Sequence, residues 1–437
     1  MAARTRTGGG KRKSLDMKIH RRRLPNRLLL MAMRTRRAPT VAITCGFEIS
    51  QIHEPESKPG LVNLLGDALD EGTEEYSGNE LAELVEGYGG FLHTGGSSVG
   101  VQMAAADVKV AVRILGQVVM HPAFPTAGVR RVKKLVTADI LADQDEPRTV
   151  AGQCFKASVY GRHPFGRAVK GTIDSVSAIT RSQLKSFHKK WFTPDNCVIA
   201  ASGDVDPEEI LDLLSKTFGS WKGKAPSVPD TDEPSEITKP LHRHLPYDRA
   251  QVQIYLGHLG VRRSDPDFYR LRVMDHILGS GPGFTSRIAR KLRDEQGLCY
   301  AVGAGISGSA GLERGTFTAY IGTSPGQETR AIQGFLREMR AIRDEPPSEP
   351  ELNVVKAYLT GSFVWGLERN ANLASYLLRL ERYELGDDYI ERLPGLINAV
   401  TREGVSESAR KHLHPDRYHL VTLGSIDKDS IARVVGS

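Results

Sequence analysis

Ala178-Ile179-Thr180-Arg181 recurs later in the chain as Ala399-Val400-Thr401-Arg402, and this repetition determines the fold that we expect. Five further positions recur at the same spacing along the chain: Pro194-Asp195 with Pro415-Asp416, Gly203 with Gly424, Asp206 with Asp427 and Ile210 with Ile431. A constant spacing over this length indicates a duplicated unit. The sequence therefore predicts two similar halves.

Each copy of the repeat contains the same order of elements. A helix follows Thr-Arg, a Pro-Asp turn leads into an apolar strand (residues 197–201 or 420–423), and a second helix begins at Asp206 or Asp427. Hydrophobic periodicity predicts further strands and helices in both halves. The strands are 41–49, 99–105, 252–256 and 315–321, and the helices are 107–120, 269–278, 286–296 and 331–342. Interleaved strands and helices predict an α+β fold, in which each half is a sandwich of a mixed, largely antiparallel sheet and helical layers.

The boundary between the halves is expected in residues 223–235, which are rich in proline, serine and acidic residues and lack periodicity. We divide the chain into a basic arm at 1–17, an N-terminal half at 18–235 and a C-terminal half at 236–437. A chain of 437 residues suits two such units.

Composition and charge are those of an ordinary globular protein, with 40% hydrophobic and 25% charged residues. Because no apolar run approaches the roughly 20 residues of a membrane helix, we expect no membrane insertion and a cytoplasmic location. Residues 1–37 contain 13 lysines and arginines and one acid, Asp16, although the whole chain carries only +7. We expect the arm to be disordered. Nucleic-acid or anionic-surface contact and organelle targeting are the alternatives for the arm.

Residues 60–73, Gly-Leu-Val-Asn-Leu-Leu-Gly-Asp-Ala-Leu-Asp-Glu-Gly-Thr, predict an amphipathic helix. Leucine, valine and alanine form one face, and Asn63, Gly66, Asp67 and Asp70 form the other. This stretch resembles the zinc helix of the insulinase/pitrilysin/mitochondrial-processing-peptidase family, whose inverted motif is H-x-x-E-H.

The stretch keeps the apolar positions of that motif but replaces its metal ligands and its catalytic glutamate. Asn63 replaces the first histidine, Gly66 the catalytic glutamate and Asp67 the second histidine, and Asp139 aligns with the downstream glutamate ligand. A catalytic zinc site needs three good donors and an open water position, so we expect no metal in this chain. A carboxylate site built from Asp67, Asp70 and Asp139 is the alternative, and it would suit Mg²⁺ or Ca²⁺ better than Zn²⁺.

The resemblance extends from about Leu24 to the end of the chain. The segment 166–172, Gly-Arg-Ala-Val-Lys-Gly-Thr, resembles the family's G-R-x-V-x-G-T, and residues 196–206 resemble its N-x-x-x-x-x-x-G-D-x-D. In the family, two α+β halves make one subunit of a clamshell that encloses a peptide chamber. We therefore expect a clamshell-type subunit.

Arg293 and Tyr300 match the spacing of the family's R-x-x-x-x-x-x-Y motif. The resemblance implies that both side chains lie beside a scissile carbonyl, where a guanidinium and a phenol can donate hydrogen bonds to its oxygen. The alternative is an arginine on an exposed helix face and a tyrosine that opens a strand.

A glycine-rich segment lies just upstream: Gly279, Ser280, Gly281, Pro282, Gly283 and Phe284. It resembles in position the substrate-handling loop of noncatalytic family subunits, and its alternative is a plain helix-to-helix connection. Histidines 412, 414 and 419 cluster near the C-terminus, and we expect them to lie at the surface or in an interface.

These observations predict a zinc-less subunit of a heterodimeric metallopeptidase, with peptides or precursors as substrates. Its partner would be a homologous subunit that carries H-x-x-E-H and the zinc, and nucleic acid is not an expected partner. A non-proteolytic peptide-binding or scaffold subunit is the alternative.

Overall fold

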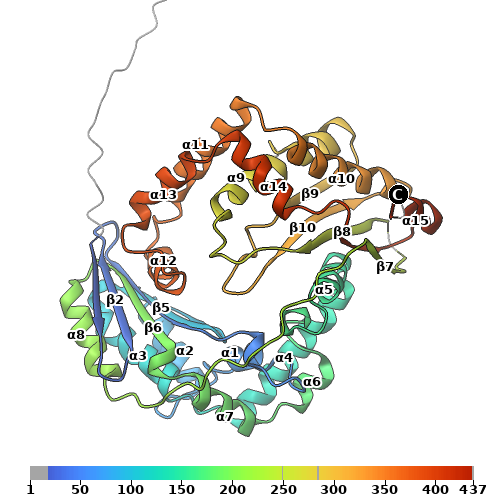
Figure 1. Ribbon diagram of the computed structural model, residues 1–437. Helices are drawn as coiled ribbons and strands as arrows, with labels where there is room; N and C mark the ends of the chain where they lie inside the picture. The colour runs from blue at the N-terminus through green and yellow to red at the C-terminus, as the bar shows by residue number, and fades with distance from the viewer. Residues whose placement is uncertain (1–17, 249, 283–284, 436–437) are drawn as a thin grey trace, which may run out of the picture.

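The computed structural model describes residues 18–248, 250–282 and 285–435. The basic arm at 1–17 lies outside these residues. In Figure 1 the two halves curve around a common interior, the first half running from blue to green and the second from yellow to red. Between them, residues 219–240 form neither helix nor strand, and the proposed boundary at residue 235 falls within this segment.

The described strands form two sheets, and apart from the additional edge strand β1 the two sheets have the same strand order. The first sheet has the order β1-β2-β6-β3-β5-β4, and the second has the order β7-β11-β8-β10-β9. One pair in each sheet is parallel, β2–β6 in the first and β7–β11 in the second. The three pairs that follow it in the strand order are antiparallel in both sheets. The bounds are β1 Ile19–Arg23, β2 Leu29–Arg34, β3 Thr40–Phe47, β4 Phe91–Thr94, β5 Ser98–Ala104, β6 Cys197–Gly203, β7 Leu241–Leu245, β8 Val252–Leu259, β9 Cys299–Gly305, β10 Thr316–Thr323 and β11 His419–Leu423. This duplicated topology confirms the mixed sheets expected from the repeat.

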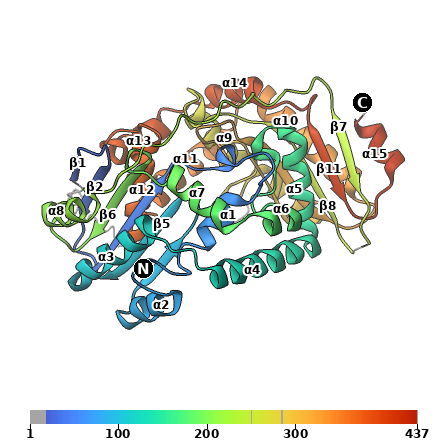
Figure 2. The same cartoon turned by 90° about the horizontal axis from the view of Figure 1, so that it is seen from below.

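Helices cover the sheets and join their strands. In the first half they are α1 Leu61–Asp67, α2 Gly78–Gly87, α3 Val108–Met120, α4 Thr126–Asp145, α5 Pro147–Tyr160, α6 Ile173–Ala178, α7 Arg181–Trp191 and α8 Pro207–Phe218. In the second half they are α9 Phe268–Leu278, α10 Glu328–Asp344, α11 Glu349–Trp365, α12 Asn370–Arg382, α13 Tyr389–Asn398, α14 Arg402–His412 and α15 Lys428–Val435. Residues 289–295, expected in an α-helix, form the π-helix η6 (Ala289–Glu295) instead. Seen from below, α4 and α6 lie together beneath α5 (Figure 2).

Strand β2 shows why this chain needs helices on both faces of its first sheet. Leu28, Leu30 and Ala32 point into one core, and Leu29, Met31 and Met33 point into another. A continuous apolar run is typical of a strand that is buried on both sides. The first core belongs to the N-terminal half, whereas the second is shared with the C-terminal half.

The two halves exchange a helix. Helix α12 of the second half packs on β3 and β6 of the first sheet, and α5 of the first half packs on β8 and β11 of the second sheet. The contacts correspond: Leu378 lies against Gly46, and Phe155 lies against Gly257. Since each sheet needs a helix from the other half to cover it, the halves are joined by packing as well as by the linker. Among the described residues, none of the helices is both long and apolar enough to cross a bilayer.

Candidate functional site

The helix that corresponds to the zinc motif is α1. Gly60 precedes it with φ +88°, a left-handed conformation that favours glycine, and Leu61, Leu64 and Leu65 bury its apolar face. On the other face the Asn63 side-chain amide donates a hydrogen bond of 2.8 Å to Asp67. Loss of water around Asp67, together with the negative charge of Asp139 on α4, raises its pKa. The structure thus brings Asn63, Asp67 and Asp139 together, three of the four positions that align with the zinc motif.

Gly66, which replaces the catalytic glutamate, lies against another part of the backbone. A Cβ atom here would lie 2.3 Å from the nitrogen of Gly96 and 2.5 Å from the carbonyl carbon of Gly95, in the turn between β4 and β5. In return, a Cβ at Gly96 would lie 2.3 Å from the carbonyl oxygen of Val62 on α1. The turn therefore occupies the space that a side chain at position 66 would need.

These residues do not fit a catalytic zinc. An amide that donates to a carboxylate, a glycine packed against a backbone turn and two aspartates do not supply three good donors around an open position. The mutual repulsion of Asp67 and Asp139 is relieved by Lys170 and Asn63, not by a metal-ligating histidine.

Glu54 is a buried carboxyl at the start of α1. One oxygen accepts a 2.8 Å hydrogen bond from the backbone N–H of Val62, and the other is buried with no partner among the described residues. Burial raises the pKa of Glu54 to about 7, despite the hydrogen bonds and the charge of Arg167 that oppose the shift. Its carboxyl is therefore partly protonated at neutral pH.

Arg293 and Tyr300 lie side by side in the second half. Arg293 lies in the last turn of η6, and Tyr300 belongs to β9 at the edge of the second sheet. The guanidinium carbon lies 5.8 Å from the tyrosine ring centroid. Tyr300 is 82% exposed, and Arg293 forms an ion pair of 3.1 Å with Asp294. Tyr300 thus faces solvent, whereas the Arg293 side chain is only 25% exposed, and the pair lies in the other half of the molecule from α1.

The glycine-rich segment is described as far as Pro282, and Gly283 and Phe284 lie outside the described residues. Gly279 packs against β9, where a Cβ would lie 2.4 Å from the nitrogen of Ala304, and Ser280 donates a 2.7 Å hydrogen bond to the Ala304 carbonyl. Its first residues therefore lie on the same strand that carries Tyr300.

The buried carboxylate of Asp275 links α9 to the residues that follow β9. Its carboxylate accepts hydrogen bonds from the N–H groups of Ile306 (2.9 Å) and Ser307 (2.7 Å) and from the Ser307 hydroxyl (2.5 Å). Burial raises the pKa of Asp275 to about 6 against these bonds. Its hydrogen bonds tie the end of α9 to the end of β9.

Asp265, Asp267 and His412 are a set of possible metal donors found among the described residues. Lys411 donates a 2.8 Å hydrogen bond to Asp267, and the His412 ring nitrogen lies 3.0 Å from the same oxygen. Lys411 and Arg270 thus already pair with the Asp267 carboxylate, as in a structural ion network. Contrary to expectation, His419 is buried in β11.

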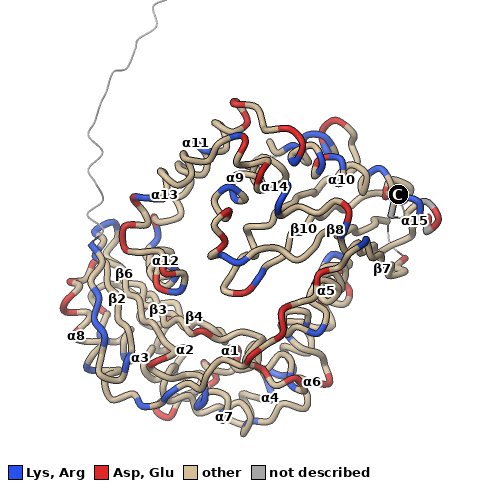
Figure 3. The backbone as a smooth tube through the Cα atoms, viewed as in Figure 1, with Lys and Arg blue, Asp and Glu red and all other residues tan. Residues whose placement is uncertain are grey.

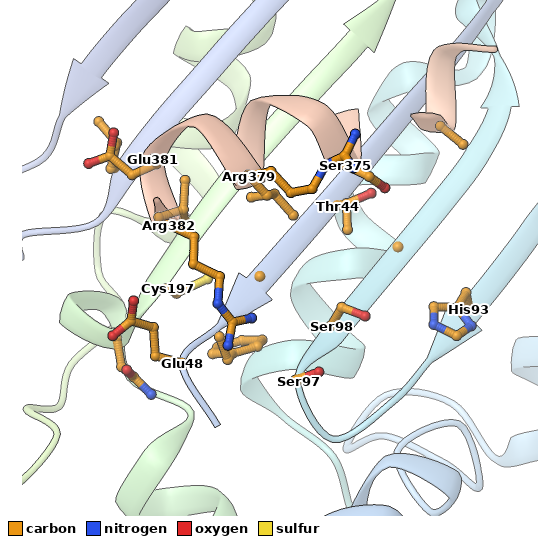
Figure 4. A pocket seen from close by; sticks show the side chains of 18 of the residues that line it. Thr44, Glu48, His93, Ser97, Ser98, Cys197, Ser375, Arg379, Glu381 and Arg382 are labelled. Carbon is orange, nitrogen blue, oxygen red and sulfur yellow. The ribbon is translucent and has the colours of Figure 1, made fainter. Parts of the chain in front are cut away.

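A cleft of about 710 Å³ lies between α12 and the first sheet. Figure 4 shows Ser375 and Arg379 of α12 above Thr44 of β3, with Ser98 and His93 beyond and Arg382 pointing towards Glu48. The cleft is lined by four arginines and four acids, which balance in formal charge: Arg23, Arg27, Arg379 and Arg382, with Glu48, Asp195, Glu381 and Glu384.

Sequence reasoning did not identify this cleft or the turn that closes α1. Arg379 and Arg382 do stand at helical spacing on one exposed face, which is a detectable signal. No local pattern, however, shows that this face lies above a sheet from the other half. Gly95-Gly96 reads as a hairpin turn, and only the tertiary fold places it on α1.

Comparison with known proteins agrees with this geometry. A family model described as the peptidase M16 inactive domain matches residues 178–359. An uncharacterised zinc protease of Mycobacterium leprae is 28% identical over 397 residues, which is 89% of this chain and 87% of that protein. An uncharacterised zinc protease of Bacillus subtilis is 25% identical over 88% of this chain and 93% of that protein.

Solved structures share the whole fold. A peptidase M16 inactive domain from Pseudomonas fluorescens has a TM-score of 0.86 and 24% identity, covering 93% of this chain and 98% of that one. A protease from Helicobacter pylori has a TM-score of 0.84 and 15% identity, covering 94% of this chain and all of that one. With the motif remnants on α1 and the duplicated halves, these matches show that residues 178–359 match the inactive domain of the M16 peptidase family and that the chain shares the fold of that domain.

Proposed function

We propose that this chain is the noncatalytic subunit of a two-chain M16 peptidase, and that its companion is a homologous subunit with an intact H-x-x-E-H motif and its zinc. The observation that carries the proposal is the closed position at Gly66, where the backbone of residues 95–96 occupies the place of the catalytic side chain. Because the described residues on α1 and α4 offer no set of zinc ligands, we assign hydrolysis to the companion.

The role we assign to this chain is to hold the polypeptide and to stabilise its carbonyl oxygen. Arg293 and Tyr300 are hydrogen-bond donors that adjoin each other, and the tyrosine is largely exposed. Donors of this kind act on the oxygen as negative charge develops on it. The segment 279–284 begins against the same strand, and we assign it a contact with the bound peptide. We also propose a cytoplasmic location, which cell fractionation tests.

The test is reconstitution with an H-x-x-E-H homologue from the same genome. We expect the isolated chain to hydrolyse no peptide in a library, and the mixture to form a complex on gel filtration that does. Chelator-sensitive hydrolysis by the isolated chain would falsify the proposal. A complex whose turnover equals that of the companion alone would instead assign this chain a scaffold role.

The donor role has its own variant. Arg293→Ala in the reconstituted complex should lower turnover by about 10²–10³, as expected for loss of an oxyanion donor. Arg290→Ala is the matched control, because Arg290 lies on the same π-helix and forms a longer ion pair of 3.6 Å with Glu295. Equal turnover of the two variants would show that Arg293 only packs.

A further inference from the structure

A second cleft, of about 400 Å³, lies between α5, residues 167–170 and the face of the second sheet that α5 covers. Its lining contains four cations and a single carboxylate: Arg148, Lys156, Arg167 and Lys170, with Asp143. We propose that this cleft binds the side-chain carboxylates of an acidic polypeptide segment. The inference rests on the proposed function, since it names the class of polypeptide that this subunit recruits.

Most of the positive charge in this cleft is not neutralised within the chain. Lys170 pairs with Asp143 at 2.8 Å. Among the described residues, Arg148, Lys156 and Arg167 have no acidic partner within 4.0 Å. Three cations are therefore available to a ligand.

Arg167 carries the clearest unsatisfied group. Its Nη1 atom is buried and has no hydrogen-bond partner in the described part of the chain. A buried donor without a partner costs free energy. A carboxylate that accepts a hydrogen bond from the guanidinium would remove this cost. The charge of Arg167 acts on the buried carboxyl of Glu54, but the two side chains form no ion pair in the described part of the chain.

The cleft is also held in shape before any ligand arrives. Phe155 and Tyr255 stack with centroids 5.7 Å apart and form an apolar floor, and the Tyr255 hydroxyl donates a 3.3 Å hydrogen bond to the Arg148 carbonyl. The Arg148 guanidinium lies 4.2 Å from the Tyr320 ring centroid, in a cation–π contact. An apolar floor beneath fixed cations suits the hydrocarbon stem of a glutamate.

The spacing of the cations favours a polypeptide over a small anion. Arg148 and Lys156 are eight residues apart on α5, which is about 12 Å along a helix axis. In an extended strand, carboxylates four residues apart are separated by about 13 Å. A single phosphate cannot span this distance, whereas an extended segment with acids at alternate positions can contact both ends.

The balanced cleft beneath α12 supplies the internal comparison. Arg379 on α12 corresponds to Lys156 on α5, because each follows the residue that packs against the glycine of the opposite sheet, Leu378 or Phe155. Four acids accompany the arginines there, so an acidic segment has no comparable net attraction to that cleft. Figure 3 shows basic and acidic residues spread around both halves, so the local lining decides the preference rather than a charged half.

The experiment measures binding of short labelled peptides to the isolated full-length chain by fluorescence anisotropy. One peptide carries glutamate at alternate positions and the other carries glutamine there, and both are N-acetylated and C-amidated so that only side-chain carboxylates differ. We expect the glutamate peptide to bind at least tenfold more tightly. Lys156→Gln should weaken it about fivefold, the upper range for one exposed charge pair. Arg379→Gln is the matched control and should leave the affinity unchanged.

Three outcomes overturn the inference. They are equal affinity for the two peptides, equal weakening by Lys156→Gln and Arg379→Gln, and displacement of the peptide by millimolar inorganic phosphate, which would indicate a small-anion site. The companion assay separates this inference from the proposed function. Hydrolysis by the complex without a glutamate preference overturns only the inference, and glutamate-dependent binding without any hydrolysis overturns only the proposed function.

Discussion

The two halves of this protein follow one plan but differ at the positions where chemistry would occur. Apart from β1, both have the same strand order. In both, a helix from the other half packs against a glycine of a central strand, Gly46 of β3 or Gly257 of β8. In the first half the motif helix is closed by the turn at residues 95–96. In the second half, Tyr300 beside Arg293 is open to solvent.

The difference shows that packing and chemistry are separable in this fold. Positions that bury apolar surface keep their character in both halves, since each sheet loses stability without its covering helix. The following experiments test how far each half depends on these positions.

The largest expected effect is at the closed motif. Gly66→Ala places a Cβ within 2.3–2.6 Å of the backbone of residues 95–96, so we expect a loss of about 3 kcal/mol or more in the free energy of unfolding. Gly361→Ala in α11 is the control, because a Cβ there meets no neighbouring atom, and it should stabilise by about 0.5–1 kcal/mol. Urea unfolding measures both. Wild-type stability of Gly66→Ala would show that the turn yields easily.

The closed motif also has a functional consequence. The combined variant Asn63→His, Gly66→Glu, Asp67→His rewrites the stretch as H-x-x-E-H, yet we expect it to show no chelator-sensitive hydrolysis, since residues 95–96 exclude the glutamate. Peptidase assays with added zinc check this. Activity in this variant would mean that only the side chains had been lost.

The exchanged helices differ in how deeply they are buried. Phe155 is 1% exposed, and Phe155→Ala should cost about 3–5 kcal/mol in unfolding free energy. Leu378 is partly buried, so Leu378→Ala should cost about 1–2 kcal/mol. Chemical denaturation of both variants ranks the two contacts, and a reversed ranking would place the stronger link on the α12 side.

Glu54 in the first half and Asp275 in the second are buried carboxyls whose pKa values are raised by burial. The pKa of Glu54 rises from 4.5 to about 7 on folding, so its stabilising effect is complete below pH 4.5 and is lost as pH rises through 7, a change of about 3 kcal/mol. Glu54→Gln keeps the acceptor for Val62 without the charge. This variant should match the wild type near pH 4.5 and exceed it in stability above pH 8, as thermal unfolding across pH would show.

Asp275→Asn provides the contrast. Asp275 accepts from three donors, so an amide NH₂ would face one of them, and the variant should be less stable at every pH. If Glu54→Gln destabilises the protein above pH 8 as well, the second oxygen of Glu54 must have an ionic role.

The smallest effect on stability is expected at Tyr300. Because the ring is 82% exposed, Tyr300→Phe should change the unfolding free energy by less than about 0.5 kcal/mol. Turnover of the reconstituted complex should nevertheless fall, since the phenolic donor is lost. A large loss of stability would assign the tyrosine to packing.

Much of the fold was predictable from local patterns, and the errors are informative. The strand at Thr40–Phe47 and the helix at Val108–Met120 follow hydrophobic periodicity, which depends on near neighbours along the chain. Residues 289–295 form a π-helix where the local pattern predicts an α-helix, and this segment contacts β9 and α10. His419 is buried because it belongs to a central strand of the second sheet.

By itself, the sequence determined the duplication, the α+β class, the family resemblance and the residues Asn63, Gly66 and Asp67 in place of a zinc ligand set, because each of these follows from residue identity at fixed spacing. Only the tertiary structure decided that α5 and α12 change places between the halves, that the turn at residues 95–96 closes α1, and that Arg148, Lys156 and Arg167 line one cleft. These contacts join segments far apart in the chain, and their energies depend on surface complementarity that no local pattern encodes.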